Sequence, residues 1–213
     1  MTGSPSGGFT VLDHPLIRHK VALLRDTATP LRDFKQLVGE IAGLMTYEVT
    51  RDLPTEPVAV HTPLETTEGH RIAQKIALIP ILRAGLGMVD GITALIPNAR
   101  VGHIGLYRDH DSLKPVSYYF KVPEPIGDHR VLVLDPMLAT GGSAAEAIDE
   151  LKKAGARHIS LLCLVAAPEG VQTFTARHPD VPVFAAALDR ELNANGYILP
   201  GLGDAGDRLF GTR

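Results

Sequence analysis

Residues 131–144 read Val-Leu-Val-Leu-Asp-Pro-Met-Leu-Ala-Thr-Gly-Gly-Ser-Ala, an apolar run that stops at an acid and then turns through two glycines. Four β-forming residues in succession predict a strand that is covered on both faces, as in a parallel sheet. Ligands of such sheets bind outside the carboxyl ends of the strands. The stretch therefore predicts an α/β fold with Asp135 at the open edge of the sheet.

The glycine turn after this strand predicts an anion site. Gly141 and Gly142 have no Cβ, so backbone N–H groups can approach a ligand closely. The helix expected over 143–154 adds free N–H groups and the positive end of its dipole. Asp135 would repel a phosphate but can accept hydrogen bonds from neutral hydroxyls, so a ribose 5-phosphate satisfies both demands. For a Thr-Gly-Gly motif alone, an ordinary strand, turn and helix without a ligand is the alternative.

Composition points to one substantial domain over residues 1–213, with a Gly/Ser-rich flexible tail over 1–10. The chain is 45% hydrophobic and 21% charged, and its net charge of −3, with no Lys/Arg stripe, argues against a nucleic-acid partner. No apolar run is long enough to span a bilayer and the start lacks a signal-peptide core, so we expect a cytoplasmic protein with no membrane partner. The single cysteine, Cys163, lies in an apolar run and is expected to pack in the core.

Other apolar patterns predict further elements around the same sheet. Residues at helical spacing predict a buried helix over 31–45, capped by Thr29 and opened by Pro30. A stretch rich in β-formers over 116–122 predicts a hairpin arm instead of a central strand. Apolar-rich stretches predict strands over 76–82, 159–165 and 183–188, and residues 101–107 predict another strand whose glycines allow close packing. A short strand over 58–60 precedes a turn-prone stretch over 62–69.

Two arginines directly follow predicted strands. Arg83 follows 76–82, and Arg108 follows 101–107. A guanidinium makes forked, permanently charged contacts with phosphate oxygens. A surface salt bridge is the simpler interpretation of either arginine alone, but their placement at strand ends favours a phosphate site.

Three segments resemble the uracil phosphoribosyltransferase family, which is a branch of the type I phosphoribosyltransferases. They are the Asp135 loop, residues 80–88 (Pro-Ile-Leu-Arg-Ala-Gly-Leu-Gly-Met) and residues 197–208, which end in Gly-Leu-Gly-Asp-Ala-Gly-Asp-Arg. Pro136 stands where other type I loops usually carry a second acid. The resemblance implies a phosphoribosyltransferase-like α/β fold, with a mainly parallel sheet flanked by helices, a β-arm, and a small hood over the base. Residues 189–213 are expected to contribute to this hood, with or without N-terminal segments.

The resemblance also implies a reaction and its residues. A pentosyltransferase (EC 2.4.2.9) of pyrimidine salvage would convert uracil and 5-phospho-α-D-ribose 1-diphosphate (PRPP) into UMP and diphosphate. Asp204 and Arg108 would be catalytic. PRPP would contact Arg83, Arg108, Asp135, Pro136, Met137, Leu138, Ala139, Thr140, Gly141, Gly142, Ser143 and Asp204, and uracil would contact Ile198, Gly203, Asp204 and Ala205.

The implied partners are few. Magnesium (Mg²⁺) would be carried mainly by PRPP and water, without a dedicated protein metal site. GTP activates some relatives, and the family forms homodimers or larger assemblies. Asp207 and Arg208 are expected to form a structural ion pair.

Three rival functions are open. Another phosphoribosyltransferase, for a purine or a different pyrimidine, would share the PRPP loop but should lack the ending over 197–208. An RNA-binding regulator that keeps the fold is disfavoured by the weak charge, and salt-dependent binding would reveal it. A nucleotide-sugar or dinucleotide binder is disfavoured because no Gly-x-Gly-x-x-Gly follows a first strand.

Overall fold

The fold is built on one nine-stranded sheet, seen in a computed structural model that describes residues 8–108 and 115–212, with Arg108 and Pro115 as backbone only. All its strand pairs are parallel except β6 with β7, which confirms the predicted α/β class. The strand order is β1 (Phe9–Val11), β11 (Val183–Leu188), β10 (His158–Ala166), β8 (His129–Leu134), β4 (Lys75–Leu82), β6 (His103–Arg108) and β7 (Pro115–Lys121), with β5 (Arg100–Val101) beside β4 and β9 (Met137–Leu138) beside β10.

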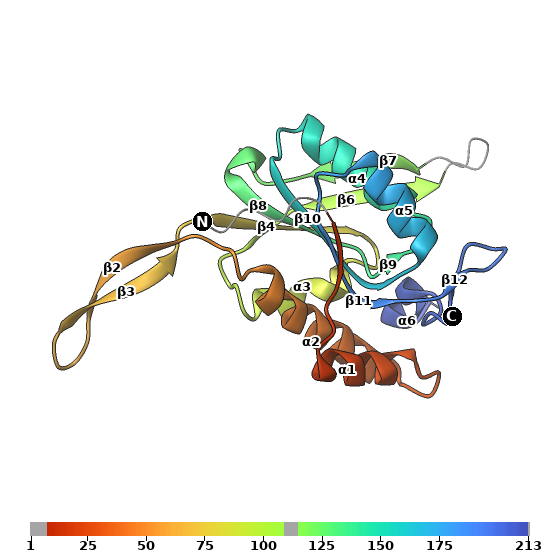
Figure 1. Ribbon diagram of the computed structural model, residues 1–213, viewed down its shortest axis with the longest axis horizontal. Helices are drawn as coiled ribbons and strands as arrows, with labels where there is room; N and C mark the ends of the chain where they lie inside the picture. The colour runs from red at the N-terminus through yellow and green to blue at the C-terminus, as the bar shows by residue number, and fades with distance from the viewer. Residues whose placement is uncertain (1–7, 109–114, 213) are drawn as a thin grey trace.

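Helices cover both faces of this sheet (Figure 1). One face carries α1 (Pro15–Arg25), α2 (Leu31–Val49) and α3 (Leu86–Thr93), and the other carries α4 (Gly142–Lys153) and α5 (Pro168–Arg177). Along β8, Leu132 and Leu134 pack on the first layer, whereas Val131 and Val133 pack on the second. Residues 131–134 of β8 are therefore buried on both faces of the sheet, as predicted from their continuous apolar run.

Residues 189–212 lie outside the main sheet and form a C-terminal unit, which packs on the core through Ile198, Leu202 and Leu209. It contains the antiparallel pair β12 (Glu191–Leu192) and β13 (Ile198–Leu199), followed by α6 (Ala205–Phe210). A short 3₁₀ helix, Ile126–Asp128, leads into β8. None of the helices in the described ranges is long and apolar enough to cross a bilayer.

The projecting arm lies elsewhere than predicted. It is the antiparallel hairpin of β2 (Thr55–His61) and β3 (Thr66–Ile72), which stands off the body in Figure 1. The turn expected over 62–69 was too long, because β3 begins at Thr66. Residues 116–122 do form a hairpin, but β7 pairs with β6 at the edge of the main sheet and does not project as an arm.

Two predictions about where ordered elements begin were wrong. Phe9 and Thr10 belong to β1, which pairs with β11, so the tail does not extend to residue 10; residues 1–7 lie outside the described part. Phe9 packs against the core, which offsets the flexibility suggested by its Gly/Ser-rich surroundings. Thr29 does not cap α2: Pro30 is the N-cap residue, and the Thr29 hydroxyl donates to the carbonyl oxygen of Leu23.

Cys163 packs in the core, as predicted. Its side chain is fully buried in the middle of β10, with Sγ 3.6 Å from the carbonyl oxygen of Phe184. Burial raises the pKa of this thiol far above its ordinary value, with a smaller contribution from the charge of Asp135. Cys163 is therefore protonated at neutral pH and is unsuited to nucleophilic chemistry.

Candidate active site

The loop after β8 is fixed by its neighbours. The Asp135 N–H donates to the carbonyl oxygen of Leu162, and the Pro136 carbonyl accepts from the N–H groups of Leu164 and Val165. Gly141 is the N-cap residue of α4 with a φ of 81°, and a Cβ built there would lie 2.6 Å from the carbonyl oxygen of Gly170. This position therefore requires glycine both for its conformation and for space.

A cavity of about 190 Å³ runs along this loop. Its lining joins the predicted phosphate loop to residues of the C-terminal unit: Asp135, Met137, Leu138, Ala139, Thr140, Gly141, Ser143, Ala144, Asn195 and Gly196. Pro136 and Gly142 are not among the lining residues. Pro136 is buried and contributes through its carbonyl group, which anchors the loop to β10.

A second cavity of about 250 Å³ adjoins the first. It brings together every residue predicted to contact uracil, and its lining is Ala84, Asp135, Met137, Ala139, Gly196, Tyr197, Ile198, Gly203, Asp204, Ala205 and Gly206. The two cavities share Asp135, Met137, Ala139 and Gly196. The phosphate loop, residues 137–143, and the glycine-rich main chain of residues 196–206 thus meet at the carboxylate of Asp135. We call the main chain of residues 198–205 the base-binding wall.

Residues 193–197 form a turn that lies across both cavities. The Asn193 side-chain oxygen accepts from the N–H groups of Asn195 and Tyr197, each at 2.9 Å, and Glu169 Oε1 accepts from the Leu192 N–H at 3.0 Å. Sequence reasoning did not assign Asn195, Gly196 or Tyr197 to the site. An Asn-Gly pair signals a turn, but it does not reveal what the turn lies against.

Asp135 is electrostatically unusual. Burial raises the pKa of its carboxyl group from 3.8 to about 6, and the Met137 N–H, 3.4 Å away, opposes this only weakly. No described lysine or arginine forms an ion pair with it. The carboxylate can therefore gain stabilisation from hydroxyl donors on a ligand.

Comparisons with known proteins agree with this arrangement. Residues 11–212 match the uracil phosphoribosyltransferase family. The chain belongs to this family. It is 62% identical over 204 residues to a uracil phosphoribosyltransferase of Symbiobacterium thermophilum, covering 95% of this chain and 98% of the relative.

Solved structures have a similar fold. The AQ2163 protein from Aquifex aeolicus superimposes with a TM-score of 0.91 at 36% identity, covering 96% of this chain and 99% of the other. A hypoxanthine phosphoribosyltransferase from Trypanosoma cruzi has a TM-score of 0.52 at 11% identity, covering 74% of this chain and 75% of the other, which shows likeness of fold alone. The predicted phosphoribosyltransferase-like α/β fold of this chain is thus confirmed.

The two arginines expected in a uracil phosphoribosyltransferase end neighbouring parallel strands. Arg83 follows β4 through a cis peptide bond, and its exposed guanidinium lies 5.7 Å from the ring centroid of Phe210. It forms no ion pair with a described residue, and it does not line either cavity. Arg108 ends β6, and its side chain lies outside the described part of the chain.

Asp204 and Arg208 have distinct structural roles in this member of the uracil phosphoribosyltransferase family. Asp204 caps α6, with Oδ1 accepting from the Asp207 N–H at 2.9 Å, and the same residue lines the second cavity. The guanidinium of Arg208 donates to the carbonyl oxygens of Leu24, Asp26 and Leu202, so it links α1 to the C-terminal unit. Arg208 is thus held by backbone carbonyls. The expected ion pair with Asp207 is not among the ion pairs between described residues.

The raised pKa of Asp135 predicts a pH dependence for the activity of this chain. The family resemblance assigns Asp135 to the ribose hydroxyls of PRPP, and an ionised carboxylate accepts hydrogen bonds more strongly than a protonated one. On that assignment, kcat/KM for PRPP should fall about tenfold per pH unit below about pH 6. Initial rates between about pH 4.5 and 8 measure this profile. Because PRPP itself titrates, the same fall in an Asp135→Asn variant would assign the profile to the substrate and contradict the prediction.

Proposed function

We propose that the chain transfers the 5-phosphoribosyl group of PRPP to N1 of uracil and releases UMP and diphosphate. The observation that carries this proposal is the pair of adjoining cavities, one along the phosphate loop and one along the glycine-rich wall, with Asp135 between them. Such an arrangement suits two ligands that must meet at the anomeric carbon of a ribose.

The phosphate loop would bind PRPP. Backbone N–H groups at the start of α4 and the hydroxyls of Thr140 and Ser143 would hold the 5-phosphate, while Asp135 would accept hydrogen bonds from the ribose hydroxyls. Arg83 and Arg108 would neutralise the diphosphate as it leaves. No covalent enzyme nucleophile is needed, because aligning the reactants and stabilising the leaving group lower the barrier directly.

The C-terminal unit would recognise the base. Uracil alternates carbonyl acceptors with N–H donors, which main-chain groups near Ile198, Gly203 and Ala205 can match in a fixed plane. Gly203 has a φ of 81°, a conformation that gives its peptide groups an orientation other residues rarely adopt. Asp204 would face the PRPP side of the bound base.

Magnesium fits this site as a substrate-borne ion. Among the residues that the structure describes, no group of three or more His, Cys, Asp or Glu is arranged to hold a metal. Two carboxylates, Asp135 and Asp204, do line one cavity, and Mg²⁺ on PRPP commonly needs only one or two protein ligands. When bound, the ion supplies positive charge to the diphosphate, and Asp204 would orient it through water.

The decisive experiment measures diphosphate release with PRPP and Mg²⁺ while one base is supplied at a time. The bases are uracil, cytosine, adenine, guanine, hypoxanthine and orotate. Turnover with uracil alone is expected; turnover with another base would refute the base site, and no turnover with any base would favour a nucleotide-sensing role. Adding GTP to the uracil assay tests the effector implied by the family resemblance.

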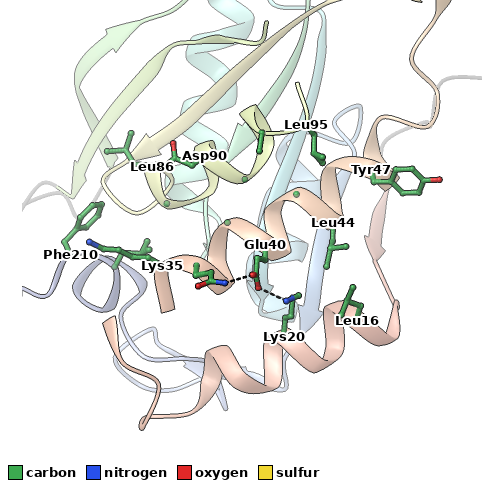
Figure 2. A pocket seen from close by; sticks show the side chains of 17 residues that line it. Leu16, Lys20, Lys35, Glu40, Leu44, Tyr47, Leu86, Asp90, Leu95 and Phe210 are labelled. Carbon is green, nitrogen blue, oxygen red and sulfur yellow. Dashed lines mark hydrogen bonds and ion pairs between the residues drawn. The ribbon is translucent and has the colours of Figure 1, made fainter. Parts of the chain in front are cut away.

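The proposal includes a homodimer or larger assembly, supported by two surfaces that one copy leaves uncovered. The β2–β3 arm is a two-stranded hairpin, a unit that is marginally stable alone, and Leu64 at its tip is 96% exposed. A cleft of about 1040 Å³ also opens between α1, α2, α3 and α6. Figure 2 shows Tyr47 at one end of this cleft and Phe210 at the other, with Lys20 bound to Glu40 between them.

Charges placed on these two surfaces are expected to dissociate the assembly. Leu64→Asp on the arm and Tyr47→Asp at the cleft would each place a desolvated charge in the interface, so light scattering after gel filtration should give a lower mass than for the unmodified chain. Lys153→Glu, on an exposed part of α4 on the opposite face of the sheet, is the control and should leave the mass unchanged. A monomeric unmodified chain would contradict the proposal.

A further inference from the structure

An ion pair behind the base-binding wall involves residues that neither cavity contains. Arg25 is the last residue of α1 and Asp189 directly follows β11, 164 positions later. Arg25 Nη1 donates to Asp189 Oδ2 at 2.7 Å, and Nη2 donates to Oδ1 at 2.5 Å. The Asp189 side chain is 4% exposed and that of Arg25 is 23% exposed. This is a forked pair in a shielded setting, where geometry is well defined.

The pair holds both peptide groups that flank one residue, Gly201. Arg25 Nη1 also donates to the carbonyl oxygen of Gly201 at 2.7 Å, and the Gly201 N–H donates to Asp189 Oδ2 at 2.8 Å. Gly201 has a φ of 62°, and a Cβ there would lie 2.2 Å from the carbonyl oxygen of Ile198. The main chain at Gly201 is thus fixed by the two charged groups and by its contact with Ile198.

Gly201 lies between the two parts of the base-binding wall. Ile198 precedes it, and Gly203, Asp204 and Ala205 follow it. On its other side is a cavity of about 510 Å³ whose lining includes Arg25 and Gly201. Ile198, Leu202 and Ala205 are buried in the core, but Gly201 has no side chain, so hydrogen bonds fix the orientation of its peptide groups.

We propose that Arg25 and Asp189 are positioning residues that set the plane of the base-binding main chain and thereby its selectivity for uracil. The inference rests on the proposed function, because it assumes that residues 198–205 bind the base. A buried N–H or carbonyl misplaced by a fraction of an ångström recognises uracil poorly, whereas the PRPP loop is anchored separately on β10. Loss of the ion pair should therefore raise KM for uracil far more than KM for PRPP.

The test uses Arg25→Lys, which keeps the charge but loses the planar fork that binds both Asp189 oxygens and the Gly201 carbonyl, and Asp189→Asn, which keeps an oxygen for the Gly201 N–H. KM for uracil should rise about tenfold in Arg25→Lys and discrimination against cytosine should fall, while KM for PRPP stays within about twofold. Millimolar guanidinium should partly restore uracil KM in Arg25→Ala. Arg130→Lys, in the Arg130–Asp52 pair at the start of β8, is the matched control and should change neither KM.

Two outcomes would overturn the inference: an equal rise in both KM values, or a lower Tm with both KM values unchanged. A separate variant, Ala205→Val, adds methyl groups directly to the base cavity. If Ala205→Val raises KM for uracil while Arg25→Lys does not, only the positioning role fails. If Ala205→Val also leaves uracil kinetics unchanged, the base site itself is misplaced.

Discussion

Replacing Asp135 with asparagine is expected to lower kcat/KM for PRPP about 100-fold, because ribose hydroxyls lose a charged acceptor at the boundary of both cavities. Initial-rate kinetics with varied PRPP measure this effect.

The same substitution should raise the stability of the folded protein at neutral pH. The raised pKa means that the folded state carries the cost of an ionised, desolvated carboxylate above about pH 6, and this cost disappears as the pH falls toward 3.8.

Asp135→Asn should therefore have a Tm equal to or above that of the unmodified chain at about pH 7.5, and the difference should shrink as the pH approaches about 4. Asp180→Asn is the control, because that carboxylate belongs to a surface pair with Lys152. It should leave PRPP kinetics unchanged. Unchanged PRPP kinetics in Asp135→Asn would remove Asp135 from the site, and a large fall in its Tm at neutral pH would show that the residue is mainly structural.

Gly141→Ala is expected to reduce kcat/KM for PRPP by about 100-fold or more. The left-handed φ of 81° costs an alanine about 1–2 kcal/mol, and the new Cβ would lie 2.6 Å from the Gly170 carbonyl oxygen, so the backbone must move. Any movement there displaces the N–H groups at the start of α4 that we assign to the 5-phosphate. Kinetics with varied PRPP, together with thermal unfolding, measure the two consequences separately.

Gly155→Ala is a matched control at the other end of the same helix. Gly155 also has a positive φ, 95°, but a Cβ there meets nothing within 4 Å. This variant should lose about 1 kcal/mol of stability with little change in PRPP kinetics. Equal kinetic effects in Gly141→Ala and Gly155→Ala would mean that helix stability, and not loop geometry, controls PRPP use.

The central sheet could be predicted from sequence because burial on both faces leaves a direct trace. Runs such as 131–134 and 183–188 are apolar at every position, and the structure places both in the sheet interior. The β2–β3 arm has no comparable apolar run. Its strands carry Thr, Glu and His with most positions exposed, so no alternation of apolar and polar residues marks β3.

The candidate site was partly predictable for a similar reason. Glycines, hydroxyls and an acid at a strand end carry local chemical information, so the Asp135 loop could be recognised from sequence. The contribution of Asn195 depends on where a distant turn lies, and Arg25 and Asp189 look like ordinary surface charges until the fold brings them together. Local patterns do not contain such long-range contacts.

The isolated thiol of Cys163 makes the chain convenient for site-specific labelling. This cysteine is buried and protonated, and it is the single cysteine of the sequence, so maleimide reagents should leave the folded native protein unmodified. If a cysteine replaced the exposed Glu65 on the arm, it would then be the residue that reacts with a fluorophore or spin label. Distances between such labels would report on assembly directly, without removing any native residue beforehand.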